Sequence, residues 1–332
     1  MALGTERHSR TRHNVRDRAE LSLAHFVLRT PAMDELCKWG AGVVWAVLVA
    51  ACGHESEPGT ATDLAGSMLP EDAGAFLVSY GASRCYGSCP ELATTLDHTG
   101  HVAYFGGQCA ARAGAFTREV GASAARSFYQ QLLASPFRRL HAQYLTAADG
   151  CTSSSVDGPG YTWSVTADGA RKDVRFSPGC RGFAELRALG ELASAFATST
   201  GTSAWSAATS LQCDYQIGPL RDVRFAVSFG GAPLGLLQLQ AGSDSFVWTS
   251  CTGEPLVTGA VIRDTQTYAL QRVVLVDAQH GPLRLPGALG TAGSLVLAMP
   301  KAADGALPTS AEVLRDDGSV TLALAPADAC PP

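Results

Sequence analysis

The chain has 332 residues, and its length alone suggests about two domains of ordinary size. Hydrophobic residues make up 46% and charged residues 17%, so the chain can bury a sizeable core and does not have the composition of a disordered protein. The formal net charge is −5, and the sequence contains no basic stripe, which excludes a typical nucleic-acid-binding protein.

An apolar run that ends at a cysteine is the first interpretable feature. Residues 39–51 are 13 apolar or small residues, too few to span a bilayer as a helix but suited to the core of a signal peptide. Cys52 follows directly, and residues 48–52 (LVAAC) resemble a lipobox, where bacteria attach diacylglycerol to the cysteine and cleave before it. We therefore predict a lipoprotein signal peptide at residues 33–51 and a lipid anchor on Cys52.

The residues on either side of this signal give its context. Residues 1–32 are Arg-rich and lack core-forming periodicity, so we expect a miscalled start or a disordered extension. Residues 52–73 are polar, with Gly, Pro and acids, and predict a flexible lipidated tether. Gly53 rather than Asp follows the anchor, which by resemblance to enteric lipoproteins favours the outer membrane. We expect a lipid-anchored protein of the cell envelope, facing the periplasm or the cell surface.

From residue 74 the pattern changes to short strands and two helices. Strands are predicted at residues 75–82, at 92–96, where apolar and polar residues alternate, and in a hairpin around Asp168-Gly169. Apolar residues at helical spacing predict helices at residues 122–134 and 183–197. The order strands, helix, strands, helix predicts an α+β domain, an antiparallel sheet with two helices on one side.

One motif in this region resembles a known family. Cys85-Tyr86-Gly87-Ser88-Cys89-Pro90 follows a strand, and a Tyr-x-Trp strand at 161–163, Gly179-Cys180 and a closing helix that leads to residues 201–205 come later. In this order the segments resemble the bacterial domain of unknown function 6438, over about residues 74–205. The family has no assigned activity, so the resemblance implies a fold and no function.

The second half has almost no helical periodicity. After a linker at residues 206–212, residues 213–332 contain short strand-like segments separated by Gly-, Asp-Gly- and Pro-containing turns, which predict an all-β, sandwich-like or barrel-like domain. The predicted strands are residues 221–229, 234–240, 245–250, 260–263, 268–276, 294–298 and 319–324. We expect this half to bind an envelope protein or a glycan.

Eight cysteines follow the predicted anchor, an even number that suits disulfides in an oxidising compartment. Cys85 and Cys89 are predicted to bond, because Gly87 lets the loop curl and Pro90 disfavours the helix start typical of a redox dithiol. A redox pair and a metal site are the alternatives. Cys151 and Cys180 bracket the hairpin around Asp168-Gly169 and are predicted to bond across its outer ends.

The remaining four cysteines leave the pairing open. Cys109 is the unassigned cysteine of the first domain, and its partner is one of Cys213, Cys251 and Cys330. Cys213 is favoured because it lies nearest to the domain junction. Such a bond would cross between the domains. The alternative is two unpaired cysteines, since free cysteine is a common small buried residue.

Other residues with possible chemistry have ordinary explanations. His98 and His101 could form a metal group with Asp97, but exposed turn histidines explain them as well. Trp163, Trp205 and Trp248 are expected to anchor cores rather than stack on a ligand. The sequence has no G-x-S-x-G, H-E-x-x-H or phosphate-loop motif, and we expect no cofactor or metal. The predicted function is a non-catalytic binding or structural module, with a hydrolase or thiol-redox protein as the alternative.

Overall fold

The structure is a computed structural model, and it describes residues 69–85, 87–154, 157–207, 219–265, 270–302, 304–327 and 329–330. All of these lie in the second of two units, Asp63–Pro332. The predicted signal peptide, the lipidation site Cys52 and most of the predicted tether fall outside the described residues. Leu69 and Ala73 are buried in the core, so the packed part of the chain already begins within the segment predicted as tether.

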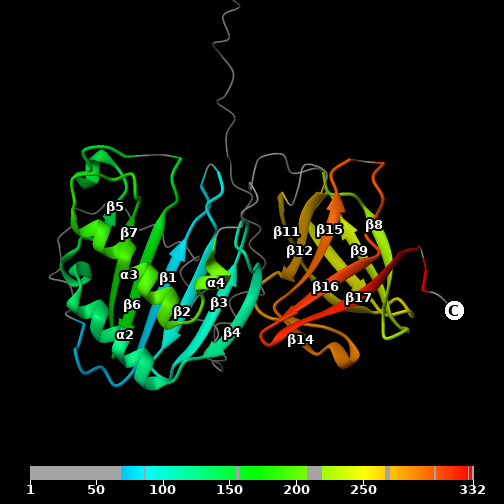
Figure 1. The fold of residues 1–332 in the computed structure, drawn as a ribbon, viewed down its shortest axis with the longest axis horizontal. Coiled ribbons are helices and arrows are strands. Elements are labelled where there is room, and N and C mark those ends of the chain that lie inside the picture. Colours follow the sequence, from blue (N-terminus) through cyan, green and yellow to red (C-terminus); the bar gives the residue numbers. More distant parts are fainter. Residues whose placement is uncertain are drawn as a thin grey trace, which may run out of the picture. The chain divides into compact units, whose positions relative to one another are not determined.

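The first domain is built on a seven-stranded sheet of order β4-β3-β2-β1-β6-β7-β5 (Figure 1). Its strands are β1 (Phe76–Ala82), β2 (Leu92–Asp97), β3 (His101–Gly106), β4 (Gly114–Glu119), β5 (Gln143–Tyr144), β6 (Tyr161–Ala167) and β7 (Ala170–Phe176). The prediction of a purely antiparallel sheet is wrong for β5, which pairs parallel to β7. Between β4 and β5 the chain passes through α2 and η3, so β5 is not joined to its neighbour β7 by a hairpin.

Two helices cover one face of this sheet (Figure 1). They are α2 (Ala122–Ala134) and α3 (Glu185–Ser199); shorter elements are η3 (Pro136–Arg139), η4 (Ala147–Asp149) and α4 (Ser203–Ser206). Phe128 of α2 and Phe196 of α3 contact the ring of Trp163, which is fully buried in β6. The helices thus bury the apolar face that alternation gives the strands.

The hairpin β6–β7 forms as its sequence predicts. Ala167 pairs with Ala170, so Asp168 and Gly169 make a two-residue turn, both with positive φ. The Asp168 carboxylate accepts hydrogen bonds from the backbone N–H groups of Gly74 and Ala75, each at 2.9 Å. This turn therefore holds the chain where it enters β1.

The second domain is a closed eight-stranded barrel of order β10-β11-β12-β15-β16-β17-β8-β9. Its strands are β8 (Val223–Phe229), β9 (Ala232–Gln240), β10 (Ser245–Thr249), β11 (Pro255–Thr265), β12 (Leu270–Asp277), β15 (Ser294–Pro300), β16 (Ser310–Arg315) and β17 (Gly318–Pro326); β13 (Leu283–Arg284), η5 (Gly287–Leu289) and β14 (Thr291–Ala292) lie in one connection. Of the two predicted architectures, the barrel is the one present.

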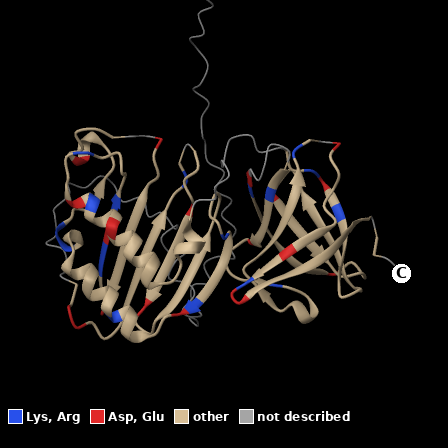
Figure 2. Ribbon diagram, viewed as in Figure 1, with Lys and Arg blue, Asp and Glu red and all other residues tan. Residues whose placement is uncertain are grey.

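Large side chains fill the barrel. The side chains of Phe225, Phe246 and Trp248 are at most 1% exposed. Leu275 and Leu297 lie in the same hydrophobic cluster. An eight-stranded barrel is just wide enough for side chains to occupy its interior. The barrel therefore has a packed core. Figure 2 shows that charged residues of both signs are scattered over the described elements of both domains.

Hydrogen bonds join the segment around β4 to barrel strands within this unit. Ser294 donates to the carbonyl of Ala113 at 2.7 Å, and the Ala115 N–H donates to the carbonyl of Gly293 at 3.1 Å. A Cβ on Gly293 would lie 2.2 Å from the Phe116 ring, so only glycine allows this approach.

A buried ion pair lies beside these bonds. Arg272 of β12 pairs with Asp264 of β11 at 2.6 Å, and Asp264 is only 2% exposed. Arg272 also donates to the carbonyls of Ala110 and Ala111. A charge this deeply buried is costly unless its hydrogen bonds are satisfied, and these contacts supply such bonds.

Candidate binding site

Disulfides fasten the loops at one end of the first domain. Cys85 and Cys89 are bonded, with their Cα atoms 5.4 Å apart, and so are Cys151 and Cys180, with a Cα separation of 5.0 Å. The Cys85–Cys89 bond lies in the loop between β1 and β2 and not at the start of a helix. It therefore lacks the helix-dipole environment that lowers a redox-active thiol's pKa.

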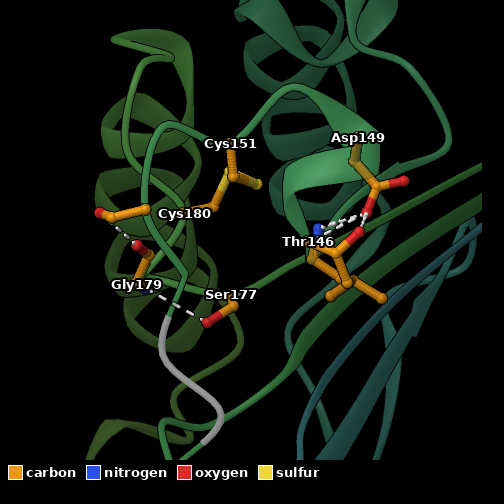
Figure 3. The surroundings of a disulfide bond; sticks show 8 residues. Thr146, Asp149, Cys151, Ser177, Gly179 and Cys180 are labelled. Carbon is orange, nitrogen blue, oxygen red and sulfur yellow. Dashed lines mark hydrogen bonds between the residues drawn. A yellow bond between two sulfur atoms is a disulfide. The ribbon is translucent and has the colours of Figure 1, made fainter.

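The Cys151–Cys180 bond ties the segment after η4 to the segment that leads into α3 (Figure 3). The Thr146 and Asp149 side chains form a reciprocal capping box around η4, and the Gly179 N–H donates to the Ser177 hydroxyl at 3.2 Å. Both ends of the bond are therefore held locally, and the start of α3 is fixed.

The other cysteines narrow the pairing left open by the sequence. Cys251 and Cys330 bond to each other, with a Cα separation of 5.5 Å. Cys109 is also in a disulfide, and its partner lies outside the described residues. Two of the three partners considered for Cys109 are thus excluded. Cys213 is the third, and it too lies outside the described residues.

A cavity of about 950 Å³ lies between the sheet and α3, at the end of the sheet where these loops meet. Leu92, Ala82, Tyr161 and Phe176 stand next to one another on β2, β1, β6 and β7 and line it. The loops add a rim, formed among others by Cys89, Pro90, Pro159, Pro178 and Cys180. The lining is therefore mainly apolar, and the Cys85–Cys89 and Cys151–Cys180 disulfides both contribute to its rim.

Small residues on α3 make room for the cavity. Gly190, Ala193 and Ala197 recur at spacings of three and four, so they share the helix face that lines it. The larger Leu189 and Phe196 are buried in the neighbouring core. A Cβ added at Gly190 would meet no atom within 4 Å. The helix thus packs closely on one side, while the exposed Gly190 borders the open side of the cavity.

Two tyrosines add polar groups to the apolar lining. The rings of Tyr80 and Tyr161 are stacked with centroids 6.1 Å apart. Burial, and for Tyr80 also the nearby Tyr161, raises the pKa of each phenol above its ordinary value. Both side chains are therefore neutral at physiological pH. Neither hydroxyl has a hydrogen-bond partner among the residues that the structure describes.

Arginine supplies the charge in the lining. Arg181 precedes α3 and Arg187 lies in its first turns, and no carboxylate belongs to the lining that the structure describes. Arg187 pairs with Glu191 at 3.2 Å, but the two side chains are 87% and 68% exposed, so water weakens this pair. The Arg181 guanidinium has no ion pair within the described part of the chain. The rim of the cavity is therefore positively charged.

The histidine group considered for metal binding is explained by a turn. The Asp97 carboxylate accepts hydrogen bonds from Thr99 and from the His101 N–H. Partial burial opposes ionisation, yet these bonds hold the pKa of Asp97 below its usual value. The His101 ring lies 2.7 Å from Glu119 on the neighbouring strand. No group of three possible metal ligands occurs among the described residues.

The tryptophans pack as predicted for Trp163 and Trp248, which are fully buried in the two cores. Trp205 is half-buried beside Tyr104, with Arg112 and Arg118 over its ring at 4.9 and 5.4 Å. None of the three lines the cavity. They hold the fold, and the rings that face the cavity belong to Tyr80, Tyr161, Phe176 and Phe183.

The cavity was missed by reasoning from the sequence, which placed binding in the strand-rich half. The sequence predicted Trp163 as a core anchor on the strand that also carries Tyr161, but not that α3 leaves part of this face uncovered. The stripe Gly190-x-x-Ala193-x-x-x-Ala197 was the available signal. Small residues on one face of a helix occur both at close helix contacts and beside cavities, so the pattern alone does not distinguish them.

Comparison with known proteins gives one family and no named relative. No curated protein and no solved structure matches the chain. Across the described residues, none of the helices is both apolar enough and long enough to pass through a membrane. Residues 76–197, from β1 through most of α3, match the model of the family described as Domain of unknown function (DUF6438). The first domain of this chain belongs to that family.

Proposed function

We propose that this protein is an exported, lipid-anchored envelope protein that binds a small ligand in the cavity beneath α3, without catalysing its conversion. The cavity carries the proposal. Its volume of about 950 Å³ lies within the range of ligand pockets, roughly 300–1,000 Å³. Its lining of apolar and aromatic side chains with a few polar groups also has the composition of such pockets.

The disulfides support export. Six of the described cysteines form three bonds with one another, and Cys109 is in a further one. Disulfides persist in oxidising compartments and are rare in the cytosol. The apolar run that ends at Cys52 supplies the signal and the anchor, so the membrane is the proposed first partner. An envelope protein or a glycan is the proposed ligand of the second, strand-rich domain.

The packed barrel interior supports placing the small-ligand site in the first domain. Side chains such as Phe246 and Trp248 are buried in the core of the barrel, so its interior is filled. In the first domain, the Cys151–Cys180 bond holds the start of α3, so the cavity is preformed. A preformed site binds more tightly because less entropy is lost on binding.

Variants of Gly190 test the cavity without disturbing the core. Gly190→Ala adds one methyl group into open space and should retain binding of Nile red, a neutral apolar dye. Gly190→Leu and Gly190→Trp should progressively fill the cavity and weaken binding at least about tenfold. A glycine inside a helix is about 1 kcal/mol less favourable than an alanine. Because all three variants replace this glycine, none of them should destabilise the helix backbone.

Thr198→Leu is the matched control, because Thr198 is an exposed residue of the same helix that does not line the cavity. Dye fluorescence gives the affinity, and thermal unfolding followed by circular dichroism checks the fold. Equal dye affinity of folded Gly190→Trp and the unmodified protein would contradict the proposed site.

A further inference from the structure

We propose that the ligand of this cavity is a small amphipathic anion, whose apolar body lies between the sheet and α3 and whose acidic head lies at Arg181 and Arg187. This inference rests on the proposed binding function and adds the chemical class of the ligand. Three features carry it: the apolar interior, the sign of the charge at the rim, and the tyrosine hydroxyls that have no hydrogen-bond partner among the described residues.

The interior selects an apolar body. Leu92, Ala82, Tyr161 and Phe176 form a continuous row across four strands, and Ala193 faces them from α3. Burying such a body removes its apolar surface and that of the lining from water, which is favourable in proportion to the area buried. A strongly hydrated sugar or a highly charged ligand would lose its hydration here without compensation.

The rim selects a negative head. The two charged residues in the lining, Arg181 and Arg187, are both positive. Glu191, which pairs with Arg187, is exposed and does not line the cavity. The backbone at the start of α3 adds little to this charge, because the Leu186 and Arg187 N–H groups already donate to the carbonyls of Phe183 and Ala184, and Glu185 lies in the same turn outside the lining. The two arginines therefore carry the selection for an anion. Arginine binds carboxylates through two parallel hydrogen bonds, which fixes the orientation of the head.

The backbone of Arg181 is held in place. Its carbonyl accepts from the Thr152 N–H at 2.9 Å, and its N–H donates to the Ser153 carbonyl at 3.1 Å. The adjacent Cys180 is bonded to Cys151. The guanidinium therefore extends from a fixed point at the rim. The neutral hydroxyls of Tyr80 and Tyr161, which have no hydrogen-bond partner among the described residues, belong to residues of the same lining and can donate to a ligand oxygen.

Three probes of equal chain length separate the head from the body: dodecanoate, dodecanol and dodecylamine, each below its micelle concentration, in competition with Nile red at pH 7.5. The expected order of affinity is carboxylate, alcohol, amine, with about tenfold between the first two. Added salt should weaken only the binding of dodecanoate and strengthen that of dodecylamine, since salt screens charges at an exposed rim.

The double variant Arg181→Gln with Arg187→Gln should bind dodecanoate no better than dodecanol, with about threefold lost for each exposed arginine, and should bind dodecanol as before. Arg139→Gln with Arg175→Gln is the control, because it removes two exposed arginines of the same domain that do not line the cavity. This control should leave all three affinities unchanged.

The outcomes distinguish the two proposals. If dodecanol binds as tightly as dodecanoate and the double arginine variant has no effect, the anionic ligand is refuted while the cavity stands. If none of the probes binds, and Nile red does not distinguish Gly190→Trp from the unmodified protein, the proposed binding function fails as well.

Discussion

Single aspartates hold several loops of the first domain. Asp168 accepts hydrogen bonds from two backbone N–H groups, and Asp149 accepts from the N–H groups of Leu145 and Thr146. Because these bonds favour the ionised form, they lower the pKa of each carboxyl below the ordinary value of 3.8. The sequence predicted Asp168 as a turn residue. Its second role, holding the start of β1, depends on a segment that is 93 residues away in the chain.

We predict that Asp168→Asn lowers stability at pH 7 and weakens its pH dependence. A carboxyl with a lower pKa in the folded state contributes stability above its unfolded value of about 3.8, and this contribution is lost as the pH falls through the folded pKa. Asparagine tolerates the positive φ at this position but has no charge. Urea midpoints at pH 7 and pH 3 should therefore differ less in the variant than in the unmodified protein.

Asp157→Asn is the control for that comparison, because it removes an exposed carboxylate that has no hydrogen bond among the described residues. If Asp168→Asn and Asp157→Asn change the two midpoints equally, the hydrogen bonds of Asp168 do not account for the effect.

At the scale of single elements, the predicted bounds agree best with the structure where the sequence contains a strong local signal for the start or end of a helix or strand. Helix α2 has the predicted bounds because Pro136 ends it. Helix α3 lies two residues later than predicted, and no side-chain cap marks its start. Strand β16 was not predicted, although Ala311 and Val313 alternate with exposed residues in it. It pairs with β15 and β17. The cavity depends on the distance between α3 and the sheet, which no local pattern specifies.

We predict that removing the Cys151–Cys180 bond, with both residues changed to Ser, lowers the free energy of unfolding by about 3–4 kcal/mol. The bond closes a loop over a sequence separation of 29 residues, so it restricts the unfolded chain strongly. The same change at Cys85 and Cys89, whose separation is 4, should cost only about 2 kcal/mol.

Urea unfolding of the two double variants measures this difference. The Cys151–Cys180 variant should also bind Nile red more weakly, because the bond holds the rim of the cavity. A larger loss of stability for the Cys85–Cys89 variant would show that loop length does not determine the effect.

At the scale of the whole molecule, disulfides and an anchor would combine to hold the binding domain at the envelope. We predict that Cys109 is bonded to Cys213, because Cys251 and Cys330 are bonded to each other. Peptide mapping without reduction should recover these two cysteines in one linked peptide pair. Recovery of Cys109 linked to another cysteine would contradict the assignment.

We also predict lipidation at Cys52. Metabolic labelling with a fatty-acid analogue should mark the unmodified protein and spare Cys52→Ala, because the thiol is the atom that accepts the lipid. Cys37→Ala, which changes the other cysteine before residue 85, should be labelled as before. If Cys52→Ala is labelled as strongly as the unmodified protein, the prediction of a lipid anchor on Cys52 is wrong.

The most direct test of the central claim, that the cavity beneath α3 is a ligand-binding site, is a methyl NMR titration. Protein labelled at the alanine methyl groups is titrated with dodecanoate and, in parallel, with dodecanol. The account predicts shifts of Ala82, Ala193 and Ala197, which line the cavity, and none of Ala226 and Ala311 in the barrel. Shifts confined to the barrel methyls, or no shift with either probe, would contradict it.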